Sequence, residues 1–378
     1  MPAPRVLLVA NTLPPRDVSG VGEQVLQLAA GLREAGCEVE ILGRGPGPKV
    51  LFPLFAVPAV WRALRRFRPH VVQVHESDGG LAALLVAIVA RQLDPVPRLV
   101  ALLQVSYVEE WRAVRPLVAQ GRVLGRPGGV ERRFRWLKAP LQIVLGSLTA
   151  SVADLVLAPS AATAEEIRRD YRVDAPGVLP NVTGGLAVEP LREDAAEGEG
   201  FFLFVGRLRI RKGVEVLLEA MRGVPGARLL IAGDGEHRAS LERRATALEL
   251  GPAVRFLGRC DAARVRGLLR GARALVVPSI YEGMPLVVLE AMEAGVPVIA
   301  SAVSGIPEVV EGGVTGWLVP PEAPEALAEA LAAALADPAE ASRRGEAGRR
   351  RVDERFRPRH AAAAWMRQVF GYETIPGP

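Results

Sequence analysis

Two basic side chains, Arg207 and Lys212, occupy a glycine-flanked loop that directly follows a short apolar run. The loop is Gly206-Arg207-Leu208-Arg209-Ile210-Arg211-Lys212-Gly213. A planar guanidinium and a compact ammonium together suit the oxygens of a diphosphate. Lysine occurs only at positions 49, 138 and 212 of this arginine-rich chain, so a lysine beside a glycine favours a binding role over random surface charge. The alternative is a solvated basic loop.

Two acidic residues, Glu282 and Glu290, lie on either side of the predicted start of a helix. Pro285 is expected to be the first helical residue, because proline is favoured at that position. Glu282 then lies in the preceding loop, and Glu290 lies roughly 7–8 Å along the axis from Pro285 at ~1.5 Å per residue. One carboxylate could hold a sugar hydroxyl while the other holds a ribose diol. Alternatively, Glu290 caps a neighbouring group and Glu282 is exposed.

The same helix start also offers backbone hydrogen-bond donors. The first N–H groups of a helix have no partner within the helix, and together with the helix dipole they favour phosphate oxygens. The groups expected to be available are the N–H groups of Met284, Leu286 and Val287. A phosphate bound there would lie between the two carboxylates.

Two further glycine turns follow apolar runs. One is 231–236, which contains Gly233, and the other is 14–22, which contains Gly20. Glycines at such turns let backbone N–H groups approach a phosphate closely. A tight strand-to-helix turn without a ligand has the same sequence, and 14–22 does not match a dinucleotide-binding fingerprint. A later segment, 304–308, is expected to be structural.

These loops are positioned by short apolar runs that alternate with helical patterns along the whole chain. The alternation predicts an α/β fold in which parallel sheets are covered by helices. The expected strands are 6–10, 38–42, 71–75, 99–103 and 155–158 in the first half, and 201–205, 229–232, 254–257, 274–277 and 298–300 in the second. Ligands of doubly wound sheets bind at the carboxyl ends of the strands. A cleft between two such domains is therefore the expected site.

A stretch rich in Gly, Glu, Ala and Pro separates the two halves. It predicts an N-terminal domain over 1–184, a linker over 185–199 and a C-terminal domain over 200–356. The final segment, 357–378, is expected to be helical and to pack back on the first domain. Two domains also agree with a length of 378 residues.

The composition indicates which class of ligand the protein binds and in which cellular compartment we expect it. The net charge of +5 and pI of 9.7 favour an anionic small ligand or membrane surface over nucleic acid. Cys37 and Cys260 are far apart and the chain has only four histidines, which predicts neither a disulfide nor a zinc site. The first apolar run is too short for a signal peptide, and the strongest one, 81–90, is expected to be a buried helix rather than a membrane span. We therefore expect a cytoplasmic protein, with the inner membrane face as its candidate membrane contact.

The set of motifs resembles the family-4 retaining glycosyltransferases. The resemblance is strong over 200–322 and rests on Gly206-Arg207-Leu208, Lys212-Gly213, Gly233-Asp234-Gly235-Glu236, Glu282-Gly283-Met284-Pro285-Leu286, Glu290 and Gly305-Ile306-Pro307-Glu308. It is looser over the N-terminal half, where Ser19-Gly20-Val21-Gly22 and Leu179-Pro180-Asn181 carry it. The resemblance implies a GT-B fold of two facing Rossmann-like domains and a nucleoside-diphosphate sugar as donor. It also implies transfer to a hydroxyl acceptor with retention, without a metal or other cofactor.

The resemblance also implies roles for individual residues. Arg207 and Lys212 would bind the diphosphate, Glu282 the donor sugar and Glu290 the ribose, and Gly20 would approach the phosphates from the opposite domain. Arg207, Lys212 and Glu282 are the expected catalytic residues. The expected donor-binding residues are Gly20, Gly206, Gly233, Gly283, Met284, Pro285, Leu286 and Glu290.

The chain departs from the family at one position. Relatives carry a histidine after an N-domain strand, whereas here 99–103 is followed by Gln104-Val105-Ser106-Tyr107, and His75 follows a different strand. A main-chain carbonyl with Gln104 or Ser106 could take over its positioning role. A non-catalytic nucleotide-sugar-binding protein and a sugar-nucleotide epimerase are the alternative functions, with an NAD-dependent dehydrogenase as a more distant one.

Residues 111–138 suggest where the acceptor could be. They hold seven arginines and one lysine against the single acid Glu131, interleaved with apolar and aromatic residues. This pattern would suit peripheral contact with an anionic membrane and a lipid-linked acceptor. Glycine and proline at 125–129 break any long helix, so packing on the N-terminal sheet and a soluble acceptor remain the alternative.

Overall fold

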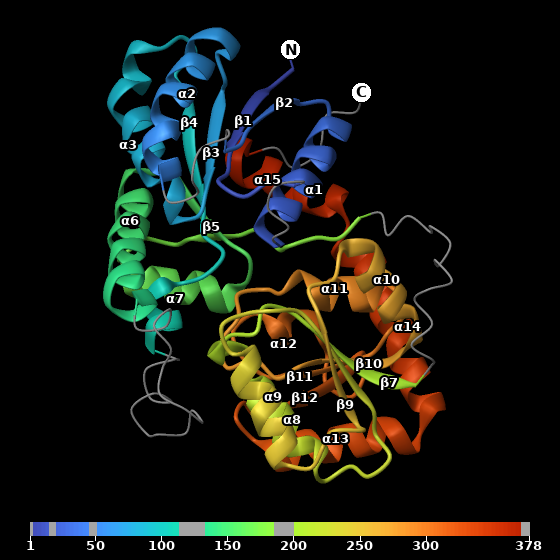
Figure 1. The fold of residues 1–378 in the computed structure, drawn as a ribbon. Helices are drawn as coiled ribbons and strands as arrows, with labels where there is room; N and C mark the ends of the chain where they lie inside the picture. The colour runs from blue at the N-terminus through green and yellow to red at the C-terminus, as the bar shows by residue number, and fades with distance from the viewer. Residues whose placement is uncertain (1–2, 15–19, 45–50, 113–132, 185–199, 372–378) are drawn as a thin grey trace. The chain divides into compact units, whose positions relative to one another are not determined.

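The computed structural model describes residues 3–14, 20–44, 51–112, 133–184 and 200–371 (Figure 1). The chain divides into two compact units. The first unit consists of 1–109, 134–184 and 356–378, and the second consists of 110–133 and 185–355. The expected linker, 185–199, lies outside the described residues.

The first unit is built on a parallel sheet of six strands in the order β2-β1-β3-β4-β5-β6. The strands are β1 (Arg5–Val9), β2 (Glu38–Leu42), β3 (Val71–His75), β4 (Arg98–Leu102), β5 (Leu155–Ala158) and β6 (Gly177–Val178). The central strands β1, β3 and β4 are buried on both faces, which explains why their sequences are mostly apolar. Gln73 and His75 of β3 are buried polar residues within this core. The two-residue strand β6 was not predicted, because two residues carry no periodic signal.

Helices cover both faces of this sheet. They are α1 (Gly20–Glu34), α2 (Phe52–Phe67), α3 (Gly80–Val89), α6 (Ala139–Val152), α7 (Ala161–Tyr171) and α15 (Pro358–Phe370). One apolar core joins the sheet to α2, α3, α6 and α7, and a second joins it to α1 and α15. The expectation that 81–90 forms a buried helix was only half right. Helix α3 buries one side through Ala82, Ala83 and Val86, whereas Ile88 on its outer side is exposed.

Helix α15 completes the second core of the first unit. Gly31 of α1 lies so close to it that an added Cβ atom would be 2.4 Å from the carbonyl oxygen of Pro358. Trp365 is fully buried, and its indole N–H donates to the side-chain oxygen of Gln73 on β3. The last helix is thus held to the first unit by packing and by a buried hydrogen bond.

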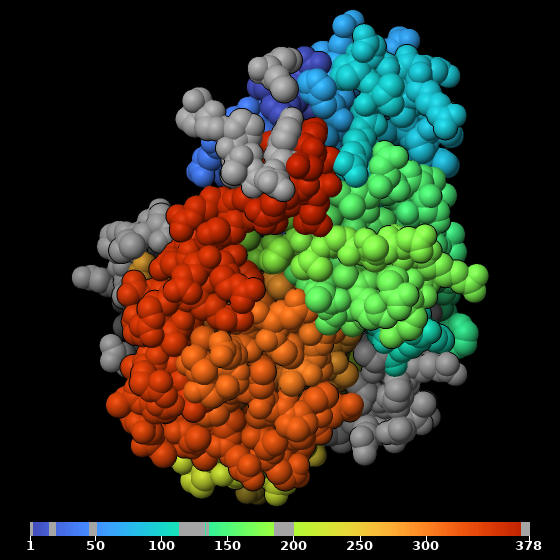
Figure 2. Space-filling model, turned by 180° about the vertical axis from the view of Figure 1, so that it is seen from behind, coloured from blue at the N-terminus to red at the C-terminus, as the bar shows by residue number. Residues whose placement is uncertain are grey.

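The second unit has a parallel sheet in the order β12-β11-β10-β7-β8-β9. Its strands are β7 (Phe201–Val205), β8 (Leu229–Ala232), β9 (Val254–Gly258), β10 (Ala272–Val277), β11 (Val298–Ser301) and β12 (Gly316–Val319). Its helices are α8 (Val214–Met221), α9 (Arg238–Ala247), α10 (Ala262–Gly271), α11 (Leu286–Glu293), α12 (Ile306–Val309), α13 (Pro324–Ala336) and α14 (Pro338–Arg355). One apolar core joins α8, α9 and α13 to the sheet. Helix α14 contacts α11 and lies at the surface of this unit (Figure 2).

The start of α11 differs by one residue from its prediction. Pro285 has φ −72° and ψ 123°, so it is the extended residue before the helix, and the first helical residue is Leu286. The fixed φ of proline is compatible with both positions, and its ψ decides between them. Both units therefore have the predicted parallel sheets covered by helices.

Candidate functional site

The strand order of the second unit changes direction between the neighbouring strands β7 and β10. The chain runs outward from β7 through β8 to β9, and then returns to the other side of β7 to form β10. In sheets of this topology, ligands bind beyond the carboxyl ends of the strands at this point. The loops that follow β7 and β10 are 206–213 and 278–285. The structure thus brings together the two segments with the sharpest chemical signals in the sequence.

The two loops are in direct backbone contact. The N–H of Ile280 donates to the carbonyl oxygen of Arg211 at 2.8 Å. Gly213 has φ +64°, and an added Cβ atom would lie 1.9 Å from the carbonyl oxygen of Pro278. Only glycine allows both this left-handed conformation and this approach. Gly213 therefore sets the distance between Lys212 and the loop after β10.

Glu282 is the centre of the side-chain contacts between these loops. The ammonium of Lys212 forms an ion pair with Oε1 of Glu282, and Nη1 of Arg211 lies 3.4 Å from its Oε2. The hydroxyl of Ser279 donates to Oε1 at 2.8 Å. Glu282 is buried, so the alternative interpretation, in which Glu282 is an exposed residue, is wrong.

The surroundings of Glu282 keep its carboxylate ionised. Burial alone would raise its pKa, because a charged group is poorly solvated in the interior. The positive charges of Lys212 and Arg211 and the hydrogen bonds from Lys212 and Ser279 outweigh burial and hold the pKa of Glu282 below its usual value. The site thus presents a fixed negative charge flanked by Lys212 and Arg211, and Arg211 is also paired with the buried Glu110 at 3.1 Å.

Two members of this cluster, Arg211 and Ser279, were missed as site residues by the sequence analysis. Arg211 lies beside Lys212 in the chain, but it was one of four cations in its loop with nothing to separate them. Ser279 lies three residues before Glu282 and is fully buried. The proximity of a serine to the acidic motif was the available signal.

Arg207 and Lys212 have different environments, although the sequence suggested a pair. Lys212 is engaged with Glu282, whereas Arg207 is exposed, and no described residue forms a hydrogen bond or ion pair with its guanidinium. Arg209, between them, forms an ion pair with Glu236 at 3.1 Å. Arg207 is therefore available to an incoming ligand without breaking an existing contact.

The turn that contains Gly233 supports the β7 loop from the other side. An added Cβ atom on Gly233 would lie 1.9 Å from the carbonyl oxygen of Gly206. The N–H of Gly206 donates to Ala232 at 3.0 Å, and the N–H of Leu208 donates to Asp234 at 3.0 Å. Gly206 and Gly233 thus act as points of close backbone approach that hold the base of the Arg207 loop.

The N-terminus of α11 lies next to Glu282 in the chain. Gly283 and Met284 are buried, and Pro285 precedes the helix without a side-chain cap. The N–H of Gly305 donates to the carbonyl oxygen of Gly283 at 3.0 Å, which gives 304–308 a structural role as expected. Leu286 is the first residue of α11 and Glu290 is the fifth, so Glu290 lies roughly 6 Å further along the axis.

Gly20 is the predicted site residue of the first unit. It is the exposed first residue of α1, and residues 15–19 before it are outside the described part of the chain. The strand order of the first unit changes direction between β1 and β3, and Gly20 begins the helix that comes after β1 in the chain.

Gln104 and Ser106 are both engaged within the first unit. Gln104 donates to the side chain of Gln24 at 2.8 Å and accepts from Asn181 at 3.0 Å. Ser106 donates to Asp170 at 2.6 Å. Both residues are buried, so they hold the loop after β4 in place through neighbouring side chains.

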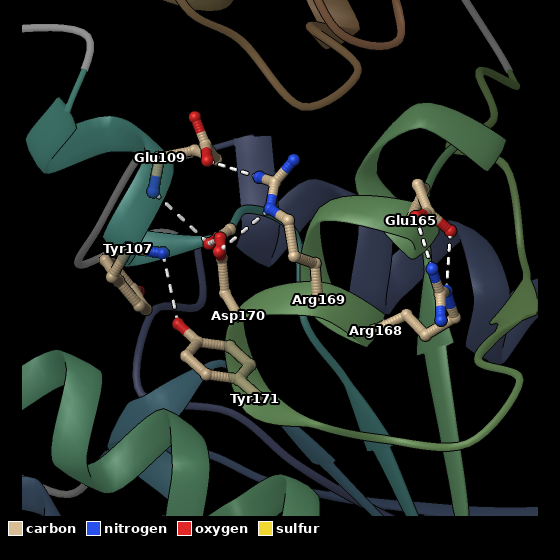
Figure 3. A network of polar contacts seen from close by, with 8 residues as sticks. Tyr107, Glu109, Glu165, Arg168, Arg169, Asp170 and Tyr171 are labelled. Carbon is tan, nitrogen blue, oxygen red and sulfur yellow. Dashed lines mark hydrogen bonds and ion pairs between the residues drawn. The ribbon is translucent and has the colours of Figure 1, made fainter.

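The same loop is tied to α7 by a wider polar network (Figure 3). The backbone N–H of Tyr107 donates to the hydroxyl of Tyr171 at 3.1 Å. Arg169 forms ion pairs with Glu109 and, at 3.2 Å, with Asp170. These contacts make the loop after β4 a rigid part of the first unit.

His75 lies in the interior of the first unit. Its residue exposure is 1%, and its Nε2 lies 3.0 Å from Nε2 of Gln73. Burial lowers the pKa of His75 to about 3, so the ring is neutral at physiological pH. Its place in the core indicates a structural role.

The predicted membrane segment, 111–138, lies mostly outside the described residues. The structure describes 111–112 and 133–138 of it. Among the helices in the described part of the chain, none is both long and apolar enough to span a bilayer.

The chain matches two sequence families that together account for both units. Residues 18–182 match Glycosyltransferase Family 4, and residues 189–351 match Glycosyl transferases group 1. It is 28% identical to glycogen synthase of Mycobacterium tuberculosis over an alignment 380 residues long, gaps included. The alignment covers 93% of this chain and 91% of that protein. It is also 28% identical to alpha-maltose-1-phosphate synthase of Mycolicibacterium smegmatis, with 95% of this chain and 97% of that protein covered.

A solved structure with the same fold supports this relationship. Sucrose-phosphate synthase from Thermosynechococcus elongatus superposes with a TM-score of 0.78 at 26% identity, and covers 97% of this chain and 99% of its own. The fold is GT-B, with the two parallel sheets described above. The chain belongs to the group 1, family 4 glycosyltransferases and is a glycosyltransferase enzyme.

Proposed function

We propose that this enzyme transfers a sugar from a nucleoside-diphosphate sugar to a hydroxyl acceptor, with retention of anomeric configuration and without a metal. The observation that carries the proposal is the ionised Glu282 held by Lys212 and Arg211 at the switch point of the second sheet. The cations suit a diphosphate, and the carboxylate suits sugar hydroxyls. In this proposal the second unit binds the donor and the first unit binds the acceptor, with Gly20 as its proposed phosphate-binding residue.

The proposed chemistry needs stabilisation of a leaving diphosphate. The bond between the anomeric carbon and the phosphate oxygen breaks, and its electron pair stays on that oxygen. Arg207, Lys212 and the N–H groups at the start of α11 would stabilise this charge. The acceptor oxygen bonds to the anomeric carbon on the face that the phosphate leaves, and the acceptor proton passes to the departing phosphate. The products are a glycoside and a nucleoside diphosphate.

The protein charges account for the proposed metal independence. A divalent cation would act by neutralising the diphosphate. Arg207, Arg211 and Lys212 place three positive charges within six residues of the β7 loop, and these can serve the same purpose. Glu290, on α11, is the proposed ribose ligand, and Gly206, Gly233, Gly283, Met284, Pro285 and Leu286 form the proposed backbone of the donor site.

The experiment is a donor and acceptor screen with product analysis. UDP-, GDP-, ADP- and TDP-sugars would first be tested for thermal stabilisation, and then for transfer with and without excess EDTA. NMR of the product should show the donor's anomeric configuration, with activity unchanged by EDTA. Inversion, or a loss of activity that magnesium restores, would contradict the proposed mechanism. Donor binding without transfer or hydrolysis would favour a non-catalytic binding protein, and a C2 epimer formed without acceptor would favour an epimerase.

A membrane-proximal acceptor is part of the proposal. The described part of 111–138 includes Trp136, Leu137 and Lys138, which are all exposed. Exposed aromatic and basic side chains of this kind suit the interface of an anionic membrane. A soluble hydroxyl acceptor in the screen is the competing outcome.

A further inference from the structure

Helix α6 presents several large apolar side chains to solvent, although Ile143 packs against the core. Its fully buried positions include Gln142, Gly146, Thr149 and Ala150. Its outer side and the π-helical segment before it, Phe134–Lys138, expose Trp136 (74%), Leu137 (62%), Leu141 (54%) and Val144 (64%). Leu137, Leu141 and Val144 follow the four- and three-residue spacing of one helical stripe. An exposed apolar stripe is the opposite of the polar outer side expected for a helix on the surface of an isolated globular unit.

The neighbouring helices of the same layer also expose large apolar residues. Helix α3 contacts both α2 and α6, and the three lie side by side over one face of the first sheet (Figure 1). Ile88 of α3 and Leu54 and Phe55 of α2 are each more than half exposed. A concentration of exposed apolar residues on one layer marks an interaction surface. We call this surface the α2–α3–α6 face.

The charge of this face identifies the chemistry of its partner. The segments 52–67, 80–92 and 134–152, which form the layer, contain no aspartate or glutamate. They contain exposed basic residues at Arg62, Arg65, Arg66, Arg91 and Lys138. Arg66 forms an ion pair with Glu40, and Arg65 lies over the ring of Trp61. Apolar residues interleaved with basic ones, without acids, complement an apolar layer under anionic headgroups.

We propose that the α2–α3–α6 face binds the surface of an anionic phospholipid bilayer. The outer stripe of α6 would enter the boundary between headgroups and acyl chains, while basic side chains at the helix ends would contact lipid phosphates. This extends the contact beyond 111–138 to a folded layer of the first unit. The consequence that the enzyme works on a membrane-bound acceptor rests on the proposed function. Bilayer binding itself requires no donor and no turnover.

The test is co-sedimentation of the full chain with vesicles of phosphatidylcholine containing increasing phosphatidylglycerol. The apolar variant is Leu141→Gln with Val144→Gln, and its matched control is Leu26→Gln with Val314→Gln. Both control residues are exposed, and they lie on α1, which packs in the other core of the first sheet, and on the second unit. The charge variant is Arg62→Gln, Arg91→Gln and Lys138→Gln. Its control replaces Arg243, Arg259 and Arg350, which are exposed on the second unit, with glutamine.

Binding should rise with phosphatidylglycerol and fall with salt. Each test variant should lower the apparent partition coefficient by about tenfold, and each control by less than about twofold. Absence of binding at low salt, or equal loss in test and control variants, would overturn the proposal. So would a wild-type dimer in analytical ultracentrifugation that Leu141→Gln with Val144→Gln dissolves, because the face would then bind a second copy.

Donor binding, measured in the donor screen, distinguishes a failure of bilayer binding from a failure of the proposed function. All four variants should retain the thermal stabilisation by the donor seen in the wild type, since none alters the β7 or β10 loop. A test variant that loses vesicle binding but keeps donor binding would show that the substitution affects the α2–α3–α6 face and not the donor site. Vesicle binding by a protein that transfers no sugar would refute the proposed function and leave the bilayer proposal standing.

Discussion

The ammonium of Lys212 and the carboxylate of Glu282 form an ion pair that joins the loop after β7 to the loop after β10. Both side chains are largely shielded from water, with 17% and 6% of their surfaces exposed. A diphosphate that enters this site would compete with Glu282 for Lys212, while sugar hydroxyls would donate to Glu282. The pair therefore holds the two proposed ligand contacts ready in their charged forms.

Replacement of one partner of this pair should destabilise the fold more than replacement of both. Glu282→Gln leaves Lys212 without its counter-charge and Arg211 with Glu110 as its remaining partner, at 3.1 Å, and we expect the free energy of unfolding to fall by about 3 kcal/mol. Lys212→Met combined with Glu282→Gln should lose less than Glu282→Gln alone, and therefore less than the sum of the two single variants. Urea denaturation of the four proteins in this cycle measures the coupling. Additive losses would show that the pair contributes no interaction energy.

Arg207→Ala should weaken donor binding without lowering stability, because its guanidinium is exposed and has no described side-chain partner. We expect donor affinity and kcat/KM to fall by about 1.5–3 kcal/mol, the range for a charge-assisted contact. Lys212→Ala should cause a similar loss in donor affinity together with a lower Tm. Titration calorimetry and thermal denaturation separate the two effects. Arg243→Ala, an exposed arginine of α9 in the same unit, is the control. Unchanged donor affinity in Arg207→Ala would remove Arg207 from the site.

Gly213→Ala should damage the site more than an otherwise similar substitution at Gly226. Both glycines have positive φ, at +64° and +81°, so alanine is strained by about 1 kcal/mol at either position. Only at Gly213 does the new Cβ atom meet backbone, at 1.9 Å from the carbonyl oxygen of Pro278, whereas nothing lies within 4 Å at Gly226. Donor affinity should fall in Gly213→Ala and remain normal in Gly226→Ala. Equal stability losses in the two variants would contradict the close approach of the loops.

Acid should destabilise the first unit through His75. The folded pKa of about 3 lies below the ordinary value of 6.5, so the unfolded chain binds the extra proton between these values. The stability contributed by the neutral ring is therefore present above pH 6.5 and is lost as the pH falls towards 3. From pH 7 to pH 5 this loss is about 2 kcal/mol. The pH dependence of unfolding should be correspondingly flatter in His75→Gln, and identical pH profiles would show that the ring is not held neutral.

The sequence was most informative where one physical cause dominates. The apolar run 201–205 became the strand β7 with unchanged bounds, because strands covered on both faces are mostly apolar. The run 71–75 became the buried strand β3 with unchanged bounds, although it also carries the buried polar residues Gln73 and His75. The glycine, basic and acidic motifs were also sufficient to indicate the β7 and β10 loops. Sheet topology alone then explains why these loops, some 70 residues apart, meet at one edge.

What the sequence left open depends on neighbours far along the chain. Periodicity in α6 reveals two helical sides but not which one is buried, since Leu141 and Val144 would ordinarily be assigned to the core. Arg211 could not be distinguished from Arg209 until the structure placed one beside Glu282 and the other beside Glu236. Tertiary contacts decide which side of a helix is buried, and they also decide which of several adjacent cations pairs with a given carboxylate.

The position of α15 has a consequence for how the chain is made. The first unit draws its strands from the first half of the sequence, but its core is closed by Trp365, near the end. A growing chain on the ribosome would therefore finish 185–355, the main segment of the second unit, while the first sheet still lacks one of its covering helices. We expect the newly made first sheet to remain incompletely folded, or bound to chaperones, until α15 emerges. We also expect chains truncated before residue 358 to be cleaved by proteases in the first unit before the second.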